Sequence, residues 1–206
     1  MAAFALSTGL PEFDYVYLMD LLKRYRCPRD KVTELLRSRE LVRVKKGIYA
    51  LGERHGQDVS LPVLANMIYG PSYVSKQYAL AHYQLIPERV YEITSMTPNR
   101  NKRFRTPLGV FSYQVLPLGL FAVGVTREQL DGLRGFLIAT REKALADLIH
   151  AERFDGVEAL EGFLSEGLRI EAEGLRALRL GMLAKINERF QSPTLAQLSE
   201  LVRRVR

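Results

Sequence analysis

Residues 23–51 read KRYRCPRDKVTELLRSRELVRVKKGIYAL, and this stretch carries the charge excess of the whole chain. Residues 23–46 contain ten Lys or Arg and three Asp or Glu, which gives a net charge of +7. The 206-residue chain has the same formal net charge of +7, so all other residues together are neutral. Positive charge concentrated in so short a segment indicates a polyanionic partner.

The hydrophobic pattern of the same stretch predicts a helix followed by a β-hairpin. Pro28 suits the first position of a helix, and apolar residues at helical spacing continue that helix to residue 38. From residue 41 the apolar period changes to two, Lys-Lys-Gly at 45–47 predicts a turn, and residues 48–51 predict the return strand. This outline is that of a winged helix-turn-helix, in which a helix enters the major groove and the wing lies on phosphate.

The outward polar side chains of this stretch are the predicted DNA contacts. Arg29, Thr33 and Arg37 are four residues apart and form a stripe on one face of the helix. Helix-plus-hairpin units also occur in proteins that do not bind DNA, and Lys-Lys-Gly is an ordinary turn. A helix and hairpin with a purely structural role therefore remain an alternative to DNA binding. The predicted DNA contacts are Arg29, Lys31, Thr33, Arg37, Arg39, Arg43, Lys45 and Lys46.

A second basic segment lies far along the chain, where no acidic residue occurs between Glu92 and Glu128. We place this segment at a hairpin tip, on either side of a β-turn. It is either a secondary DNA contact or a charged tip that keeps a sheet edge from aggregating. Its members are Arg100, Lys102, Arg103 and Arg105.

The chain as a whole predicts an α+β fold in two domains. Residues 1–55 form the winged helix-turn-helix, which begins with a helix over 11–25 capped by Asp14, and the polar segment GERHGQD at 52–58 marks the boundary. Residues 56–206 form a mixed α/β domain with a helical C-terminal tail from about residue 141. Its predicted helices span 60–69, 75–83 and 141–150, its strands span 90–96, 103–106, 110–116 and 136–139, and the tail helices span 157–166, 171–180, 182–190 and 195–205.

Catalytic and metal-binding patterns are absent from the sequence. The single cysteine, Cys27, allows neither an internal disulfide nor a cysteine-based metal site, and we expect it to pack or cap at the helix start. His55, His82 and His150 are isolated, and Asp147 three residues before His150 predicts an ion pair rather than catalysis. We therefore expect no enzyme activity, no cofactor and no metal.

Targeting and membrane signals are also absent. Residues 1–10 lack a basic start and a sustained apolar core, and the apolar run 115–125 is too short to cross a bilayer. These features predict a soluble cytoplasmic protein with no membrane partner.

Four blocks of the sequence resemble the AbiEi family antitoxins of type IV toxin–antitoxin systems. The blocks are RVKKGIYAL (43–51), LANMIYGPSYVSKQYALAHYQLIPE (64–88), TSMTPNRNKRFRTPLGVFSYQVLP (94–117) and FLIATREKALADLI (136–149). Their order and spacing carry the resemblance over about Phe13 to Ile149, and it fades in the helical tail. One departure is Arg141, where relatives often have Pro.

The resemblance implies an N-terminal winged helix-turn-helix joined to a larger antitoxin domain. It further implies a repressor that binds an operator with inverted repeats in its own operon. Such a protein counteracts a nucleotidyltransferase toxin of the AbiEii type and need not contact it. Of the residues above, the resemblance gives a DNA role only to Arg43, Lys45, Lys46 and the helix before them.

Two other functions remain open from the sequence. One is a stand-alone winged-helix regulator whose C-terminal domain senses a ligand or partner, and the neighbouring gene would distinguish it from an antitoxin. The other is a nucleic-acid enzyme that would depend on Asp147 or His150. If the chain binds DNA, replacing the wing lysines Lys45 and Lys46 by Ala should weaken binding to all sequences. It should also lower the slope of log K against log salt concentration by about 2.

Overall fold

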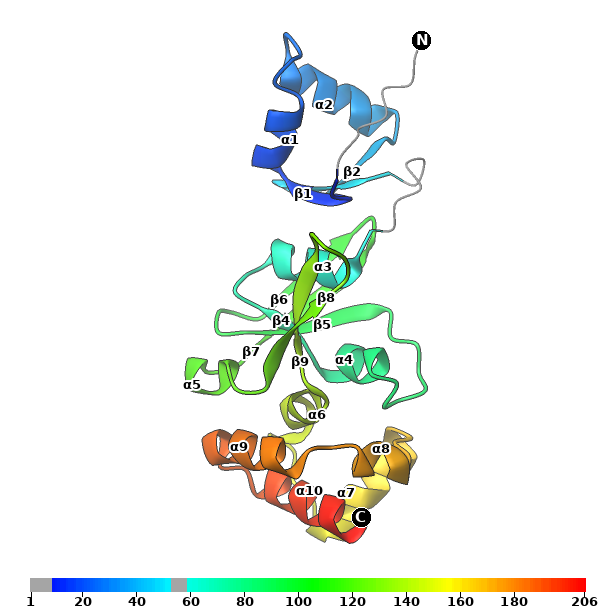
Figure 1. The fold of residues 1–206 in the computed structure, drawn as a ribbon, viewed down its shortest axis with the longest axis vertical. Coiled ribbons are helices and arrows are strands. Elements are labelled where there is room, and N and C mark those ends of the chain that lie inside the picture. The colour runs from blue at the N-terminus through cyan, green and yellow to red at the C-terminus, as the bar shows by residue number, and fades with distance from the viewer. Residues whose placement is uncertain (1–8, 53–58) are drawn as a thin grey trace.

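The computed structural model describes residues 9–52 and 59–206, which form a mixed α+β fold (Figure 1). Three tiers follow one another along the long axis: a small unit at the N-terminal end, a sheet with its helices, and a layer of helices at the C-terminal end (Figure 1). The expectations for a leader, for the polar boundary segment and for His55 fall wholly or largely on residues outside this description.

The N-terminal unit, residues 9–52, is a three-stranded antiparallel sheet with two helices. The sheet order is β1-β3-β2, and the helices lie between β1 and β2 in sequence. The predicted helix over 28–38 and the hairpin that follows it are confirmed. The elements are β1 (Glu12–Asp14), α1 (Tyr15–Leu21), α2 (Pro28–Arg37), β2 (Leu41–Lys45) and β3 (Ile48–Leu51).

The first predicted helix, 11–25, is wrong at both ends. Residues 12–14 form strand β1, which pairs with β3 and places Phe13 opposite Tyr49. Helical spacing favoured a longer helix, but pairing with the free edge of β3 buries Phe13 and satisfies the backbone there. Asp14 is nevertheless the N-cap, because its Oδ1 accepts the Tyr17 N–H at 2.8 Å.

The C-terminal unit, residues 59–206, is built on a six-stranded sheet of order β6-β7-β5-β4-β9-β8. Its strands are β4 (Tyr73–Val74), β5 (Glu92–Thr97), β6 (Lys102–Thr106), β7 (Gly109–Val115), β8 (Val125–Gln129) and β9 (Gly135–Ala139). Its first helices are α3 (Leu61–Ile68), α4 (Lys76–His82), α5 (Leu118–Phe121) and α6 (Arg141–Ile149). The helices predicted over 60–69, 75–83 and 141–150 are confirmed to within a residue or two at each end.

The predicted hairpin at the second basic segment is wrong. β6 pairs only with β7, whereas β7 pairs in parallel with β5, so the connection from β5 to β6 passes over β7 to reach the sheet edge. This order buries Phe111 and Tyr113 of β7 in the middle of the sheet. It leaves the charged strand β6 at the edge, where Lys and Arg discourage pairing with another chain.

The tail is helical, as the sequence predicts from residue 156 onward. Its elements are α7 (Gly156–Gly162), a π-helical turn η2 (Phe163–Gly167), α8 (Ala172–Arg176), α9 (Leu180–Phe190) and α10 (Pro193–Arg204). Arg204 near the end of α10 forms ion pairs with Glu158 at 2.8 Å and Glu200 at 2.5 Å. Arg204 therefore ties the end of α10 to α7.

Candidate nucleic-acid interface

The outer face of α2 presents the predicted stripe to solvent. Arg29, Thr33 and Arg37 are all exposed, whereas Val32 and Leu35 on the opposite face are buried. The Thr33 hydroxyl donates to the Arg29 carbonyl at 3.2 Å. No ion pair among residues 9–52 and 59–206 involves Arg29 or Arg37. Both guanidinium groups are therefore available to an anionic ligand.

The other predicted contacts near α2, which are Lys31, Arg39 and Arg43, differ in exposure and in charge pairing. Lys31 is largely covered, its Nζ lies 2.7 Å from Glu34 Oε1 and 5.6 Å from the centre of the Tyr25 ring, and the Glu34 hydrogen bond raises its pKa. Its charge is therefore partly compensated within the unit. Arg39 and Arg43 are exposed, one just after α2 and one on β2.

The two lysines of the predicted wing, Lys45 and Lys46, differ in their surroundings. Lys46 is exposed at the turn between β2 and β3. Lys45 turns toward the C-terminal unit, where its Nζ donates to the Ile68 carbonyl at 2.5 Å and lies 4.9 Å from the centre of the Phe104 ring. A lysine held by a carbonyl and an aromatic face is less available to phosphate than its neighbour. No local pattern in the sequence indicates this contact.

A second contact joins the two units at the opposite edge of the small sheet. The Glu12 carboxylate on β1 is buried, accepts the Ser60 N–H and lies 3.3 Å from Arg134 Nη1. Burial raises the pKa of Glu12, although Ser60 and Arg134 oppose the shift. Arg134 is also bound to Asp131 at 2.6 Å, which lowers the pKa of Asp131 to about 2. Because β1 and β2 are the two edges of the sheet, the N-terminal unit is held on both sides.

The second basic segment does not act as a single group of four cations. Arg103 donates to both carboxylate oxygens of Glu92, at 3.1 and 2.6 Å, so its charge is paired. Arg103 and Arg105 lie on one face of β6, and Lys102 and Phe104 lie on the other, because side chains alternate along a strand. All of the basic residues of the segment are exposed, including Arg100 in the preceding loop.

Asp147 has a structural role in place of the predicted pair with His150. The Asp147 carboxylate lies 2.9 Å from Lys143 Nζ, with both side chains fully buried, and accepts hydrogen bonds from Tyr73 at 2.8 Å and Ser75 at 2.7 Å. The His150 ring instead contacts the Ala146 carbonyl at 3.0 Å. Charge pairing within α6 therefore satisfies Asp147 away from solvent.

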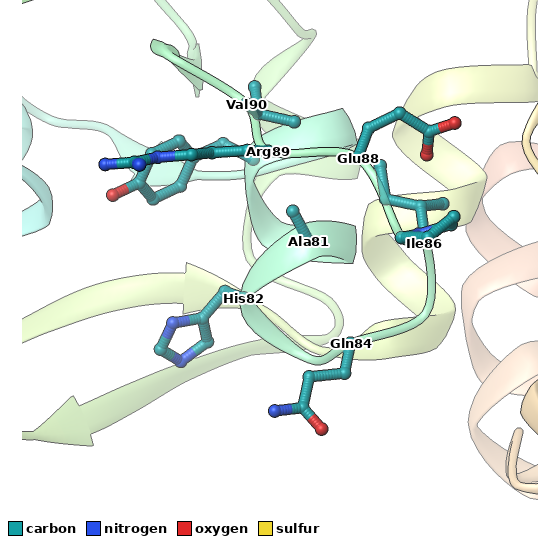
Figure 2. A pocket seen from close by; sticks show the side chains of 9 residues that line it. Ala81, His82, Gln84, Ile86, Glu88, Arg89 and Val90 are labelled. Atoms are coloured by element: carbon teal, nitrogen blue, oxygen red, sulfur yellow. The ribbon is translucent and has the colours of Figure 1, made fainter.

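Cys27 and an open pocket beside α4 are the other features that bear on catalysis. Cys27 is exposed at the start of α2 and makes no side-chain capping bond, contrary to the expected packing or capping. An open pocket of about 490 Å³ lies beside α4, with His82 and Gln84 on one side and Arg89 on the other (Figure 2). His82 Nε2 lies 3.6 Å from Glu128, and none of the residues that line the pocket is a Ser, Thr, Cys or Lys.

In the part of the chain that the structure describes, no three His, Cys, Asp or Glu side chains form a group that could hold a metal ion. No helix of those same residues combines the length and apolar character needed to cross a membrane.

No model of a known protein family matches this chain, and no curated protein is similar enough to count as a relative.

Proposed function

We propose that this chain binds double-stranded DNA through a winged helix-turn-helix formed by residues 9–52. The observation that carries the proposal is the exposed stripe of Arg29, Thr33 and Arg37 on a helix whose other face is buried. Neither arginine forms an ion pair with another described residue. The order β1-α1-α2-β2-β3 also supports it, because α2 is followed directly by a hairpin with a Lys-Lys-Gly tip. In this reading α2 enters the major groove and Lys46 lies on a backbone phosphate.

We further propose that DNA binding serves repression of the operon that encodes this chain, as part of an antitoxin function. This step rests on the resemblance of residues 13–149 to AbiEi antitoxins. The partner would be an operator with inverted repeats, and the toxin would be a nucleotidyltransferase encoded alongside. A stand-alone regulator is the alternative, and the two are separated by the neighbouring gene.

Replacing Arg29 and Arg37 by Ala tests the DNA-binding proposal. Each guanidinium that reaches a base edge or phosphate contributes about 1–3 kcal/mol, so we expect each single variant to bind about 5- to 150-fold more weakly. The measurement is fluorescence anisotropy with a labelled duplex from the region upstream of the gene, at fixed salt concentration.

The matched control is Arg189→Ala, because Arg189 is an exposed arginine in the last turn of α9, in the helical tail. It should bind as the unaltered protein does. Equal affinity of the Arg29, Arg37 and Arg189 variants would refute the role of α2, and absence of binding by the unaltered protein would refute the function.

Co-expression with the neighbouring toxin tests the antitoxin proposal. We expect growth to recover when this chain is produced together with the adjacent nucleotidyltransferase, and to remain inhibited when the gene carries an early stop codon. The measurement is colony number under induction of each gene alone and of both together. Growth inhibition that this chain leaves unchanged would favour the stand-alone regulator.

A further inference from the structure

The wing and the second basic segment meet at the junction between the two units, although they lie more than fifty residues apart in sequence. Lys45 contacts the Phe104 ring of β6 at 4.9 Å and donates to the Ile68 carbonyl at the end of α3. Lys46 follows Lys45 directly and is exposed, so the turn that carries it is tied to this junction through Lys45.

The loop before β6 is anchored to the same place. The Tyr69 hydroxyl accepts the Arg100 N–H at 3.4 Å, and the Gly70 carbonyl accepts the Asn99 side chain at 3.2 Å. The Tyr69 ring also lies 6.0 Å from the Phe104 ring. The Lys45 ammonium group and the backbone of Arg100 are therefore both anchored on consecutive residues at the end of α3, Ile68 and Tyr69.

The alternation of side chains along β6 places Lys102 and Arg103 on opposite faces of the sheet. Lys102 and Phe104 share one face of β6, opposite Tyr113 and Phe111 of β7. The Tyr113 hydroxyl donates to the Ala65 carbonyl, so this is the face covered by α3, on which Lys45 also lies. Arg103, on the other face, is neutralised by Glu92. Lys102 therefore lies on the same face of the sheet as the Lys45 contact, and Arg103 lies on the opposite face.

We propose that Lys46, Arg100 and Lys102 form one phosphate-binding surface across the junction, with Lys45 as the residue that positions the wing beside it. The proposal rests on the proposed DNA-binding function and extends the contact with the duplex beyond the wing. Duplex DNA is the favoured partner because these exposed cations extend the wing that the proposed function places on phosphate. An acidic protein surface would use the same charges without DNA.

Salt titration distinguishes direct phosphate contacts from positioning. The dependence of log K on log salt falls by about 0.9 for each phosphate contact removed. We expect Lys46→Ala to lower the slope by about 1, and the double variant Arg100→Ala/Lys102→Ala to lower it by about 2. Lys45→Ala should weaken binding with the slope unchanged. For replacement of both Lys45 and Lys46 by Ala, the proposal therefore predicts a slope of log K against log salt that is lower by about 1, whereas the sequence alone predicts about 2.

The matched control is Arg103→Ala, which removes a cation of the same strand that is already paired with Glu92. Its slope should equal that of the unaltered protein. Thermal unfolding by circular dichroism checks that each variant is folded. The positioning role of Lys45 is tested without DNA by ¹⁵N relaxation, which reports how fast each unit tumbles. In the unaltered protein both units should tumble with one correlation time, and in Lys45→Ala the N-terminal unit should tumble faster.

The outcomes separate this inference from the proposed function. If Arg29→Ala and Arg37→Ala weaken binding but Arg100→Ala/Lys102→Ala leaves the slope unchanged, the junction surface is wrong and DNA binding by α2 stands. That result would also be found if the junction binds an acidic protein. A lower slope for Lys45→Ala would make Lys45 a phosphate contact and overturn its positioning role. If no α2 variant has an effect, the proposed function itself fails.

Discussion

Replacing Asp147 by Ala is expected to lower the free energy of unfolding by roughly 3–5 kcal/mol, because it leaves the ammonium group of Lys143 buried without its counter-charge. Both side chains are fully buried, and their charged atoms are 2.9 Å apart. The Lys143 ammonium also donates to the Leu120 carbonyl at 2.8 Å and lies 4.2 Å from the centre of the Phe190 ring. Neither of these contacts supplies a negative charge, so neither can replace the carboxylate.

The loss extends to two hydroxyl groups that depend on the same carboxylate. Tyr73 and Ser75 both donate to Asp147 Oδ2 and would lose that acceptor in the Ala variant. Urea denaturation followed by circular dichroism measures the effect. The control is Asp155→Ala, an exposed aspartate before α7 that makes no side-chain capping bond. A change in stability no larger than that of the control would contradict the assigned role.

Asp147→Asn adds a pH test with a definite sign. Burial lowers the pKa of Lys143, and Asp147 opposes that shift, so removing its charge lowers the pKa further. In the window between this lowered pKa and the ordinary value of 10.5, the unfolded chain binds more protons than the folded protein. The stability of Asp147→Asn should therefore rise with pH across that window, relative to the unaltered protein. A difference that does not change with pH would refute the explanation.

Replacing Leu35 by Ala is expected to unfold the N-terminal unit alone and, with it, to remove the proposed DNA binding. Leu35 is fully buried, and deletion of such a side chain costs about 2–5 kcal/mol. The core of this unit contains eight buried apolar residues, so a loss of that size is a large part of its stability. The members of this core are Phe13, Leu18, Leu22, Val32, Leu35, Leu41, Tyr49 and Leu51.

The measurement for Leu35→Ala combines anisotropy with a ¹H–¹⁵N correlation spectrum. Resonances of residues 9–52 should collapse toward unfolded positions, while those of residues 59–206 stay dispersed. Val16→Ala on the neighbouring helix is the control, because Val16 is 75 % exposed and its loss opens no cavity. Retention of dispersed resonances in both units would show that the small core tolerates the truncation.

Local signals predicted the helices and strands whose own residues determine them. Ser60 accepts the Val63 N–H at 3.4 Å and Thr140 accepts the Lys143 N–H at 3.3 Å, so both helices begin where a capping residue predicts. The hairpin with Lys-Lys-Gly at its tip was predicted for a similar reason: Gly47 has φ of +87°, a conformation that glycine adopts without strain.

Long-range pairing explains what the sequence could not predict. Strand β8 has the polar sequence VTREQ, with no run of apolar residues, and it forms because β9 provides an edge to pair with. The place of β6 at the sheet edge likewise depends on the parallel pairing of β5 with β7. For the candidate site, the charge pattern identified the cations, but only the fold separates Lys45 from Lys46 and Arg103 from Lys102.

The contacts of Glu12 and Lys45 have a consequence for how such chains diversify. Both residues belong to the N-terminal unit, yet their partners, Ser60, Arg134 and Phe104, all belong to the C-terminal unit. An exchange of the first fifty residues between homologous genes would separate each residue from the partner with which it evolved. We therefore expect position 12 to vary together with position 134, and position 45 with position 104. If the proposed role of α2 holds, new specificity would then arise by substitution within α2 more readily than by recombination.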